Sequence, residues 1–595
     1  MNSNPSPFAA FSDDAFLFGA TNPSEGSNLY SQWQELPQVE RYGYLVNKIR
    51  IQVAGLLGVS EERVDADAAL NTFVTDSLMV ARLHNRLMAG QIEIPLAQFW
   101  QQTIHELATE IDRQLKTSKF ARVEDAAQAP DYGEEVPEHL RAAGWQPISP
   151  MQEVYHNLYQ QGVAENPAHL QIHQALWIRS SVDVPALRRA CQAFVDRHDG
   201  LRVTFTTDQG RCYQKVRPKV EVDFTMIQAQ TWTDEALIQA ADQESATPWD
   251  LVNDLGIKFR LYIRSTEDQL FHIIANHMIM DGWACWMMFD ELRTLYQAES
   301  TGVAATLPPV GWSLLDYNRW QAALLRGPEG DRLWRYWRKE LMGELTDMQL
   351  PTDYPRPATN YLWGKMCSLV LATELYQQVK HFIAREKLTY FQFFLAVLQV
   401  LLYKYCEQSE VRLATRLANR INDEVARTMT SMTNHVLLRV HLSDELTLQD
   451  VCSLAQAKAL EGLAHQGYPF LSIAEQLDIK LTAGLMPLAR VTYCFERLHI
   501  FPEAAQLFDP NDTQPVDFGG LTVESFPGFE VQTFTEGDLG FWLVEGSSTI
   551  LGGTYYNPRL FKEATIVKMN EDIARVTRTI VTNPEQCIGE LKLRS

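Results

Sequence analysis

The chain has 595 residues, and 46% of them are hydrophobic, so it is long enough to form several domains with sizeable cores. This composition excludes a disordered or fibrous protein. The formal net charge of −22 argues against a general affinity for nucleic acid or anionic membranes, because both partners require a basic face. We therefore expect neither nucleic acid nor a membrane as a partner.

The first 41 residues are rich in Ser, Asn and Pro, and they include a short acidic and aromatic stretch from Asp13 to Phe18. They lack the basic start and continuous apolar core of a signal peptide. Residues 1–41 are thus predicted to be a flexible tail or a docking segment for an upstream synthase.

Helical apolar spacing over residues 42–117 predicts a small all-α bundle. Three of its helices are expected at Tyr44 to Leu57, at Thr75 to about Ala89, and at Thr103 to Leu115. Ser77 stands at the start of the second, where the free N–H groups of a first turn favour a phosphate. Helix capping alone would also explain a serine there.

The run Asp76-Ser77-Leu78-Met79, followed by Leu83, resembles the D-S-L-x-x-x-x-L attachment motif of acyl and peptidyl carrier proteins. The resemblance implies that the bundle has four helices. It also implies a covalent 4′-phosphopantetheine on Ser77, installed by a phosphopantetheinyl transferase and able to hold an acyl group as a thioester. The match is closer to polyketide-type carriers than to many peptidyl ones, although Val74-Thr75 replaces the usual upstream glycine. Residues 118–146, rich in Ala, Glu, Asp and Pro, are expected to be a linker that lets this carrier move.

A polar run, Asn276 to Gly282, lies between a strand-like segment and a helical pattern with Asp290 and Glu291 on its polar side. His277 at such a strand end can face a cleft and accept a proton from a nucleophile near neutral pH. Asp281 would orient neighbouring groups, and Gly282 would allow close backbone approach. A structural histidine and a helix-capping aspartate explain the run equally well when it is considered alone.

The eight cysteines show neither C-x-x-C nor Cys/His metal spacing. This pattern predicts no metal site and no disulfide framework, and it fits a reducing, cytoplasmic compartment. Cys285, close to His277 in sequence, is expected to be a small buried hydrophobe. The most apolar segment, Tyr390 to Cys406, contains two glutamines and a lysine, which predicts a buried core helix and not a membrane span.

Several segments resemble, in the right order, the motifs of nonribosomal peptide synthetase condensation domains, whose central signature is HHxxxDG. The resemblance spans about residues 147 to 595. Its segments are Ser149-Pro150-Met151-Gln152 with Tyr155 (S-x-x-Q), Arg197 to Phe205 (RHExLRxxF), Asp316-Tyr317 with Trp320, Ala418-Asn419-Arg420, Asn434 before Leu437-Leu438-Arg439, and His465 to Phe470 (HQxxPF).

This resemblance implies an α/β fold of two chloramphenicol-acetyltransferase-like lobes that meet in a V, residues 147–320 and 321–595. A tunnel between the lobes would admit pantetheine arms from opposite mouths, with His277 midway. The resemblance also implies that His277 accepts or positions the proton of the nucleophile and that Asp281 pairs with Arg420. Backbone N–H groups near Gly282 could steady a developing oxyanion.

Three departures from the family pattern bear on substrate class more than on reaction type. The first histidine of the signature is Asn276, whose amide can still donate and accept hydrogen bonds in a supporting role. Ser431-Met432-Thr433 replaces the glycine and paired aromatics that usually precede Asn434. The late arginine-rich motif is reduced to Pro487-Leu488-Ala489-Arg490.

Together these features predict a carrier-linked acyltransferase of a nonribosomal peptide or hybrid polyketide/peptide assembly line. It would transfer an acyl or peptidyl group from the thioester on Ser77 to an amine or hydroxyl acceptor. An upstream synthase would load Ser77, and the acceptor would be a free small molecule or would sit on a separate carrier protein.

The alternatives are a carrier-linked epimerisation domain, a CoA-dependent acyltransferase, and a catalytically silent docking scaffold. The sequence leaves open whether the product is an amide or an ester, and whether the chain is stand-alone or an excised didomain.

Overall fold

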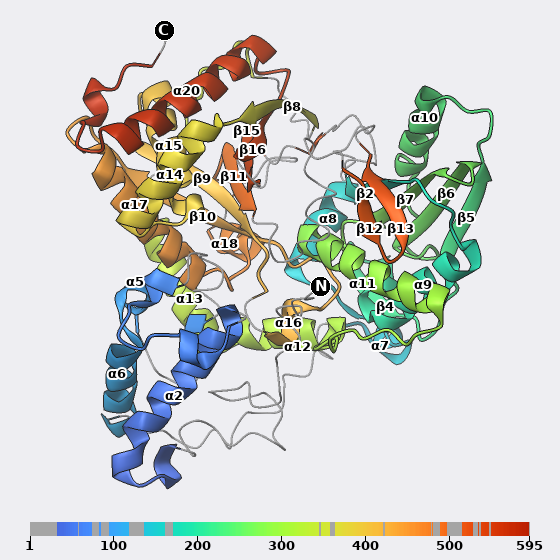
Figure 1. Ribbon diagram of the computed structural model, residues 1–595, viewed down its shortest axis with the longest axis horizontal. Helices are drawn as coiled ribbons and strands as arrows, with labels where there is room; N and C mark the ends of the chain where they lie inside the picture. Colours follow the sequence, from blue (N-terminus) through green and yellow to red (C-terminus); the bar gives the residue numbers. More distant parts are fainter. Residues whose placement is uncertain are drawn as a thin grey trace.

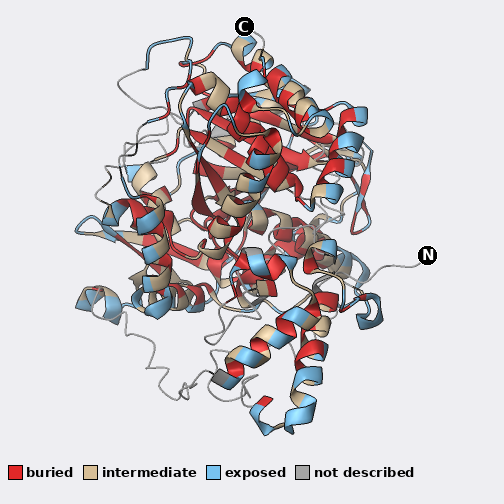
Figure 2. Ribbon diagram, turned by 90° about the vertical axis from the view of Figure 1, so that its left-hand side faces the viewer, coloured by how far each residue is buried: buried red, intermediate tan, exposed pale blue. Residues whose placement is uncertain are grey.

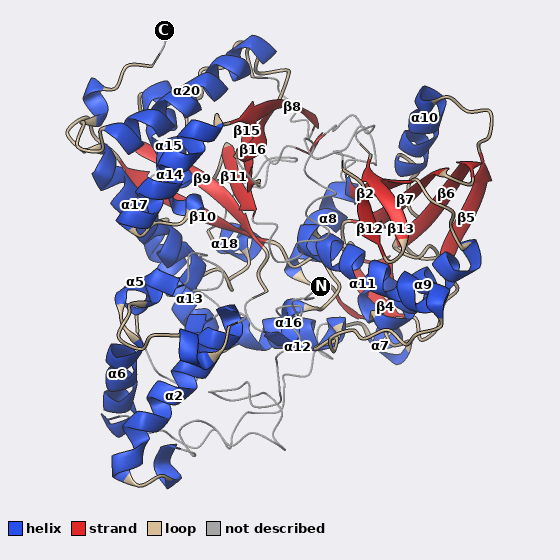
Figure 3. Ribbon diagram, viewed as in Figure 1, coloured by secondary structure: helices blue, strands red, loops and turns tan. Residues whose placement is uncertain are grey.

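The computed structural model describes residues 33–57, 59–73, 83–84, 94–117, 136–160, 170–343, 345, 347–356, 363–420, 423–477, 479, 488–496, 514–526, 533–534, 537–546 and 549–593. A helical bundle near the N-terminus is followed by two α/β lobes that stand side by side (Figures 1 and 3). Figure 2 shows that buried residues fill the interior of the lobes, whereas the bundle helices expose much of their outer faces.

The bundle is helical, as the sequence predicts. Its described elements are α2 (Gln38–Leu57), η1 (Glu61–Arg63), α3 (Leu70–Phe73), α5 (Leu96–Gln101) and α6 (Ile104–Thr117). A capping box begins α6, because Thr103 N donates to Glu106 Oε2 at 2.8 Å and Glu106 N donates to Thr103 Oγ1 at 3.1 Å. Phe99 and Trp100 are buried in the shared core. The predicted helix that begins at Thr75, with Ser77, lies outside the described residues apart from Leu83 and His84.

The first lobe is built on a six-stranded sheet in the order β12-β13-β2-β7-β6-β5. Two of these strands, β12 (Val516–Phe518) and β13 (Leu521–Ser525), come from late in the sequence. Helices α9 and α11 pack on one face around one hydrophobic core, and α10 packs on the other face (Figure 3). Its elements are α7 (Glu138–Ala142), β1 (Gln146–Pro147), α8 (Pro150–Gln160), β2 (Gln171–Ile178), α9 (Val184–Arg197), η4 (Asp199–Arg202), β3 (Val203–Asp208), β4 (Arg211–Val216), β5 (Asp223–Gln228), α10 (Asp234–Ser245), β6 (Ile257–Ser265), β7 (Asp268–Asn276) and α11 (Gly282–Thr301). Strands β1, β4 and β3 form a separate small sheet.

The second lobe is built on a seven-stranded sheet in the order β10-β9-β11-β15-β16-β8-β14. Helices α14, α15, α17 and α20 cover one face of it (Figure 1). The elements are α12 (Leu314–Arg326), α13 (Pro328–Glu340), β8 (Trp363–Val370), α14 (Thr373–Glu386), α15 (Tyr390–Cys406), β9 (Glu410–Leu417), α16 (Asp423–Ala426), β10 (Asn434–His441), α17 (Leu448–Ala464), α18 (Phe470–Gln476), β11 (Val491–Glu496), β14 (Thr533–Phe534), β15 (Leu539–Glu545), β16 (Ile550–Tyr556), α20 (Glu563–Thr582) and η7 (Ile588–Glu590).

Helix α15 is a core helix, as its sequence predicts. Most of its side chains, from Tyr390 to Cys406, are buried in the hydrophobic core of the second lobe. Within the described part of the chain, no single helix is long and apolar enough to cross a membrane. The pair α14 and α15 meets such a test only when taken together, and these two helices are bent by 106° where they meet.

The two lobes exchange segments, so a boundary at residues 320/321 does not separate them in space. Strands β12 and β13 come late in the sequence, yet β13 pairs with β2 and extends the sheet of the first lobe. Helices α12 and α16 lie between the lobes (Figure 1), where Trp312 N donates to Glu424 O at 2.9 Å. Met429, a few residues beyond α16, is buried in the core of the first lobe.

The bundle rests on the second lobe through an apolar contact between α5 and α17. Leu460 and Leu463 of α17 are buried in the same cluster as the bundle core. Both leucines belong to this shared cluster and not to the main core of their own lobe.

The tight contact between the lobes at Gly200 allows a direct test of the arrangement. A Cβ atom at Gly200 would lie 1.7 Å from the carbonyl oxygen of Met429. We expect Gly200→Ala to lower the free energy of unfolding by about 1–3 kcal/mol or more, because the backbone must move apart. The melting temperature in a thermal unfolding experiment measures this loss of stability. Gly43→Ala, in an exposed part of α2 with nothing near its Cβ position, is the control and should not destabilise. Equal melting of Gly200→Ala and the parent would contradict this packing of the lobes.

Candidate active site

His277 follows β7 directly, where the sheet of the first lobe ends. Its backbone N–H donates to Leu170 O at 3.3 Å, and its side chain is half-buried. The preceding residue, Asn276, closes β7 opposite Gln171 in the register of β2. The structure therefore places His277 at a strand end, as predicted, and leaves the residue half-buried.

Tyr155 of α8 covers the imidazole of His277. The hydroxyl of Tyr155 lies 3.2 Å from Nε2 of His277, and the two rings are stacked with centroids 4.2 Å apart and planes 15° apart. The S-x-x-Q motif supplies the start of α8. Ser149 N donates to Gln152 Oε1 at 2.8 Å, and Gln152 N donates to Ser149 Oγ at 3.2 Å, which is a reciprocal capping box.

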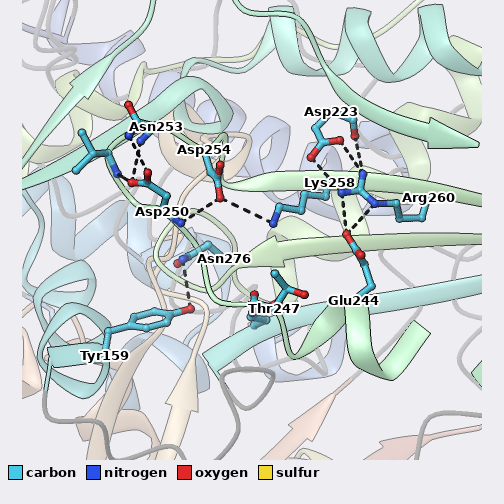
Figure 4. Close-up of polar contacts among 12 residues, drawn as sticks. Tyr159, Asp223, Glu244, Thr247, Asp250, Asn253, Asp254, Lys258, Arg260 and Asn276 are labelled. Atoms are coloured by element: carbon cyan, nitrogen blue, oxygen red, sulfur yellow. Dashed lines mark hydrogen bonds and ion pairs between the residues drawn. The ribbon is translucent and has the colours of Figure 1, made fainter. Parts of the chain in front are cut away.

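Asn276 is fully buried and holds the turn that carries His277. Its amide nitrogen donates to the hydroxyl of Tyr159 at 3.3 Å (Figure 4), and its amide oxygen accepts from Met278 N at 2.8 Å. Burial raises the pKa of Tyr159, so this phenol stays protonated and can donate to Leu170 O at 2.9 Å. An amide serves here as both donor and acceptor, so the asparagine supports the turn in the way expected for it.

Asp281 is fully buried and caps the start of α11 by accepting from Ala284 N at 2.9 Å. Its other oxygen accepts from Arg420 Nη1 at 2.7 Å, from Met432 N at 2.9 Å and from Thr433 N at 3.2 Å. Burial opposes ionisation, but the Arg420 guanidinium and the backbone donors outweigh it and hold the pKa of Asp281 below its ordinary value. The structure thus contains the Asp281–Arg420 pair that the family resemblance implies, and it leaves this carboxylate no room to react.

Gly282 is the first residue of α11 and is exposed. A Cβ atom there would meet nothing within 4 Å, so no neighbouring backbone in the described part of the chain requires a glycine at this position. The close approach expected from the sequence would therefore have to involve a substrate. The N–H of Gly282 belongs to the first turn of α11, where backbone donors have no partner within the helix.

Glu291 was expected on the polar side of its helix, and this expectation was wrong. It is fully buried, and its carboxylate accepts from His198 Nε2 at 2.7 Å, from Arg197 Nε at 3.0 Å and from Arg427 Nη1 at 2.8 Å. Burial opposes ionisation of Glu291, but the hydrogen bond from His198 and the two arginines outweigh it and hold its pKa low. The first two residues of the Arg197 to Phe205 motif therefore bind α11, and the same carboxylate joins α11 to Arg427 of the second lobe.

Asn434 and the HQxxPF-like segment also have structural roles. The amide nitrogen of Asn434 donates to Gln466 O and to Tyr468 O, both at 2.7 Å, and its amide oxygen accepts from Phe470 N at 3.0 Å. His465 stacks on Tyr336 with ring centroids 3.7 Å apart, and burial lowers the pKa of His465 to about 4. These residues hold the segment that leads into α18.

Cys285 and Leu83 are both buried. Cys285 lies on α11, and burial raises the pKa of its thiol, so it behaves as the small hydrophobe expected and not as a nucleophile.

Leu83 is the last residue of the attachment motif that begins at Asp76, and Ser77 of this motif lies outside the described residues. Leu83 is fully buried in the bundle core, which fits its place as the apolar end of a phosphopantetheine attachment motif.

Two α/β lobes meet beside a His-x-x-x-Asp-Gly run, and a helical bundle precedes them in the sequence. This combination defines a carrier-linked condensation protein. A model of the condensation domain matches residues 142–595, and a model of the phosphopantetheine attachment site matches residues 47–111. The chain belongs to the condensation-domain family and carries a phosphopantetheine-binding carrier domain before it. The resemblance found in the sequence is confirmed, as is the covalent phosphopantetheine cofactor.

The chain is similar to modules of much larger synthetases. It is 27% identical over 434 residues to a linear gramicidin synthase of Brevibacillus parabrevis, covering 72% of this chain and 8% of that protein. It is 27% identical over 519 residues to tyrocidine synthase 2 of the same organism, covering 87% of this chain and 13% of that protein. The chain therefore spans only a small part of the relatives it matches.

Solved structures confirm the fold class predicted from the sequence. The X-domain from teicoplanin biosynthesis aligns with a TM-score of 0.66 at 21% identity, over 75% of this chain and 97% of that one. The first condensation domain of the CDA synthetase aligns with a TM-score of 0.58 at 18% identity, over 75% of this chain and 98% of that one.

Removing Arg420 tests the buried pair with Asp281. We expect Arg420→Met to lower the free energy of unfolding by about 3–5 kcal/mol at pH 7, because it leaves a buried carboxylate without its cation. The pKa of Asp281 is depressed in the folded parent, so its contribution is full above about pH 4 and is lost as the pH falls through the folded pKa. The difference between parent and variant should therefore shrink in acid.

Urea unfolding at pH 7 and near pH 3 measures the loss of stability in Arg420→Met and its decrease in acid. Arg319→Met is the matched control, because Arg319 forms a half-exposed pair with Asp316 at 3.6 Å and should contribute less than about 1 kcal/mol. Equal stability of the Arg420 and Arg319 variants would show that the buried pair does not hold the lobes.

Proposed function

We propose that the chain is a condensation enzyme of a nonribosomal peptide or hybrid polyketide/peptide assembly line. It transfers an acyl or peptidyl group from a thioester on Ser77 to an amine or hydroxyl acceptor. The observation that carries this proposal is the half-buried His277 at a strand end, four residues from the Asp281 carboxylate that joins the lobes.

The chemistry requires little beyond positioning and one base. The phosphopantetheine arm would supply the thiol that holds the donor as a thioester and that leaves, as a free thiol, when the carbon–sulfur bond breaks. His277 accepts the proton of the acceptor amine or hydroxyl as that group attacks the thioester carbonyl. The N–H of Gly282, at the positive end of α11, donates to the developing oxyanion. Holding both substrates at one place supplies much of the remaining rate enhancement.

Asn276 and Asp281 take no part in proton transfer in this scheme. The hydrogen bonds of Asn276 to Tyr159 and Met278 fix the turn before and after His277. Asp281 and Arg420 fix the start of α11, so that the Gly282 N–H keeps one direction. Both roles are positioning roles: the amide of Asn276 must donate as well as accept, and the carboxylate of Asp281 must pair with Arg420.

The contact between α5 and α17 supports delivery of the donor by the chain's own carrier. It seats the bundle on the second lobe through Leu460 and Leu463. An upstream synthase would load Ser77 in the cytoplasm, after a phosphopantetheinyl transferase has modified it. The acceptor would be a free small molecule or a group on a separate carrier protein.

His277→Ala tests the role of the imidazole. We expect the rate of acyl transfer from loaded Ser77 to fall about 10²- to 10⁴-fold, with the extent of loading unchanged, because only the base is lost. Intact-protein mass spectrometry measures the mass that the chain gains when phosphopantetheine is attached. It also measures the mass that the loaded chain loses when the acyl group is transferred. Ser77→Ala is the control and should gain neither mass.

The outcomes of this experiment separate the proposal from its alternatives. Equal transfer by His277→Ala and the parent would contradict the base role, and no transfer by either would favour a docking scaffold. Inversion of the α-carbon of the aminoacyl group bound at Ser77, without transfer of that group, would favour epimerisation.

Leu463→Asp tests delivery by the chain's own carrier. The charge would be placed in the apolar contact with the bundle, so we expect the rate of transfer from Ser77 to fall about tenfold or more as the local donor concentration drops. Transfer from a free N-acetylcysteamine thioester should not change, because the lobes keep their own core. Ser453→Asp, at an exposed position of the same helix, is the control. An unchanged rate from Ser77 in Leu463→Asp would show that this contact does not serve delivery.

A further inference from the structure

Helix α8 presents two tyrosines to the residues at the end of β7. Tyr155 and Tyr159 are four positions apart, so they share one face of the helix. Tyr155 contacts His277, and Tyr159 contacts Asn276. The two adjacent residues of the candidate active site are therefore each held by one side chain of the same helix.

The geometry of the Tyr155 contact determines what it can do. Two rings whose planes differ by 15° and whose centroids lie 4.2 Å apart must be stacked face to face, because rings lying edge to edge at that separation would overlap. The Tyr155 hydroxyl, 3.2 Å from Nε2, consequently lies over the face of the imidazole. In the tautomer that can accept a proton at Nε2, the lone pair of Nε2 points outward within the ring plane, so the Tyr155 hydroxyl over the ring face is poorly aligned with it.

We propose that Tyr155 is a positioning residue for His277, a role that rests on the proposed function of His277 as the base. The phenol ring fixes the plane of the imidazole and thereby the direction in which Nε2 accepts a proton. An acceptor must then approach within that plane and not from the face that Tyr155 covers. The electron-rich face of the phenol also favours the imidazolium that forms when the proton is accepted.

Tyr155 is itself held firmly enough to perform this role. It is 7% exposed and belongs to the core of the first lobe. The capping box between Ser149 and Gln152 fixes the start of α8, and Gln152 Nε2 donates to Gln214 Oε1 at 3.0 Å. A reactive group is placed accurately only when its neighbours are themselves fixed, and these contacts meet that condition.

Tyr155→Phe and Tyr155→Leu separate the contribution of the ring from that of the hydroxyl. We expect Tyr155→Phe to keep the stack and to retain kcat within about threefold. Tyr155→Leu removes the stack, so kcat should fall about 10- to 100-fold with little change in the KM for the acceptor. The acid limb of the pH–rate profile should also move to lower pH, because the imidazolium loses its aromatic partner.

A measurement independent of turnover accompanies the kinetics. The pH titration of the His277 ring, followed by NMR of histidine-labelled chain and assigned with His277→Ala, should have a lower midpoint in Tyr155→Leu than in the parent. Tyr262→Leu is the matched control. Tyr262 is buried under α10 on the other face of the sheet, so its loss should lower the melting temperature without moving either the His277 titration or kcat.

The proposal is overturned if Tyr155→Leu matches the parent in the His277 titration and in kcat. If the parent itself shows no transfer, the proposed function fails, and the titration still decides whether Tyr155 governs His277. Should Tyr155→Leu fail to fold, Tyr155→Met, whose longer and more flexible side chain adapts to the gap but has no ring, carries the same comparison.

Discussion

The buried carboxylate of Asp281 is the interaction on which the rest of the arrangement depends. It accepts hydrogen bonds from the first turn of its own helix, from Arg420, and from the backbone of Met432 and Thr433 in the other lobe. A carboxylate withdrawn from water is tolerated only when donors surround it in this way. One side chain therefore caps α11 and joins the lobes.

A second buried carboxylate on the same helix completes the attachment. Glu291 lies ten residues beyond Asp281, about 15 Å along the helix axis, and binds Arg427 of the second lobe. Between them, Trp283 donates from Nε1 to Ala426 O at 3.0 Å. Helix α11 is thus held at several points along the segment that follows β9, and this explains how the helix start can keep one orientation relative to both lobes.

The local features of the site could be predicted from the sequence. The strand end at His277 and the capped start of α11 depend on residues close together in the chain, and hydrophobic spacing detects such features. The same holds for α15, whose apolar run predicted a core helix. The pairing of Asp281 with Arg420 came from family resemblance, because 139 positions separate them and no local pattern joins them.

The remaining features depend on contacts between distant segments. Glu291 was misplaced because helix periodicity shows only which residues share a face, and its partners come from α9 and from a loop of the second lobe. The exchange of β12 and β13 into the first lobe depends on short strands whose partners no local pattern identifies. Tyr155 follows the S-x-x-Q motif, but 122 positions separate it from His277, so its contact with the imidazole could not be inferred.

The most direct test of the central claim is a crystal structure of the chain with a non-hydrolysable acyl-thioester analogue attached through pantetheine at Ser77. The account predicts that the arm enters between the lobes and that the analogue's carbonyl carbon lies beside His277, with room for one nucleophilic atom between them. An ordered arm whose carbonyl lies away from His277 would contradict it.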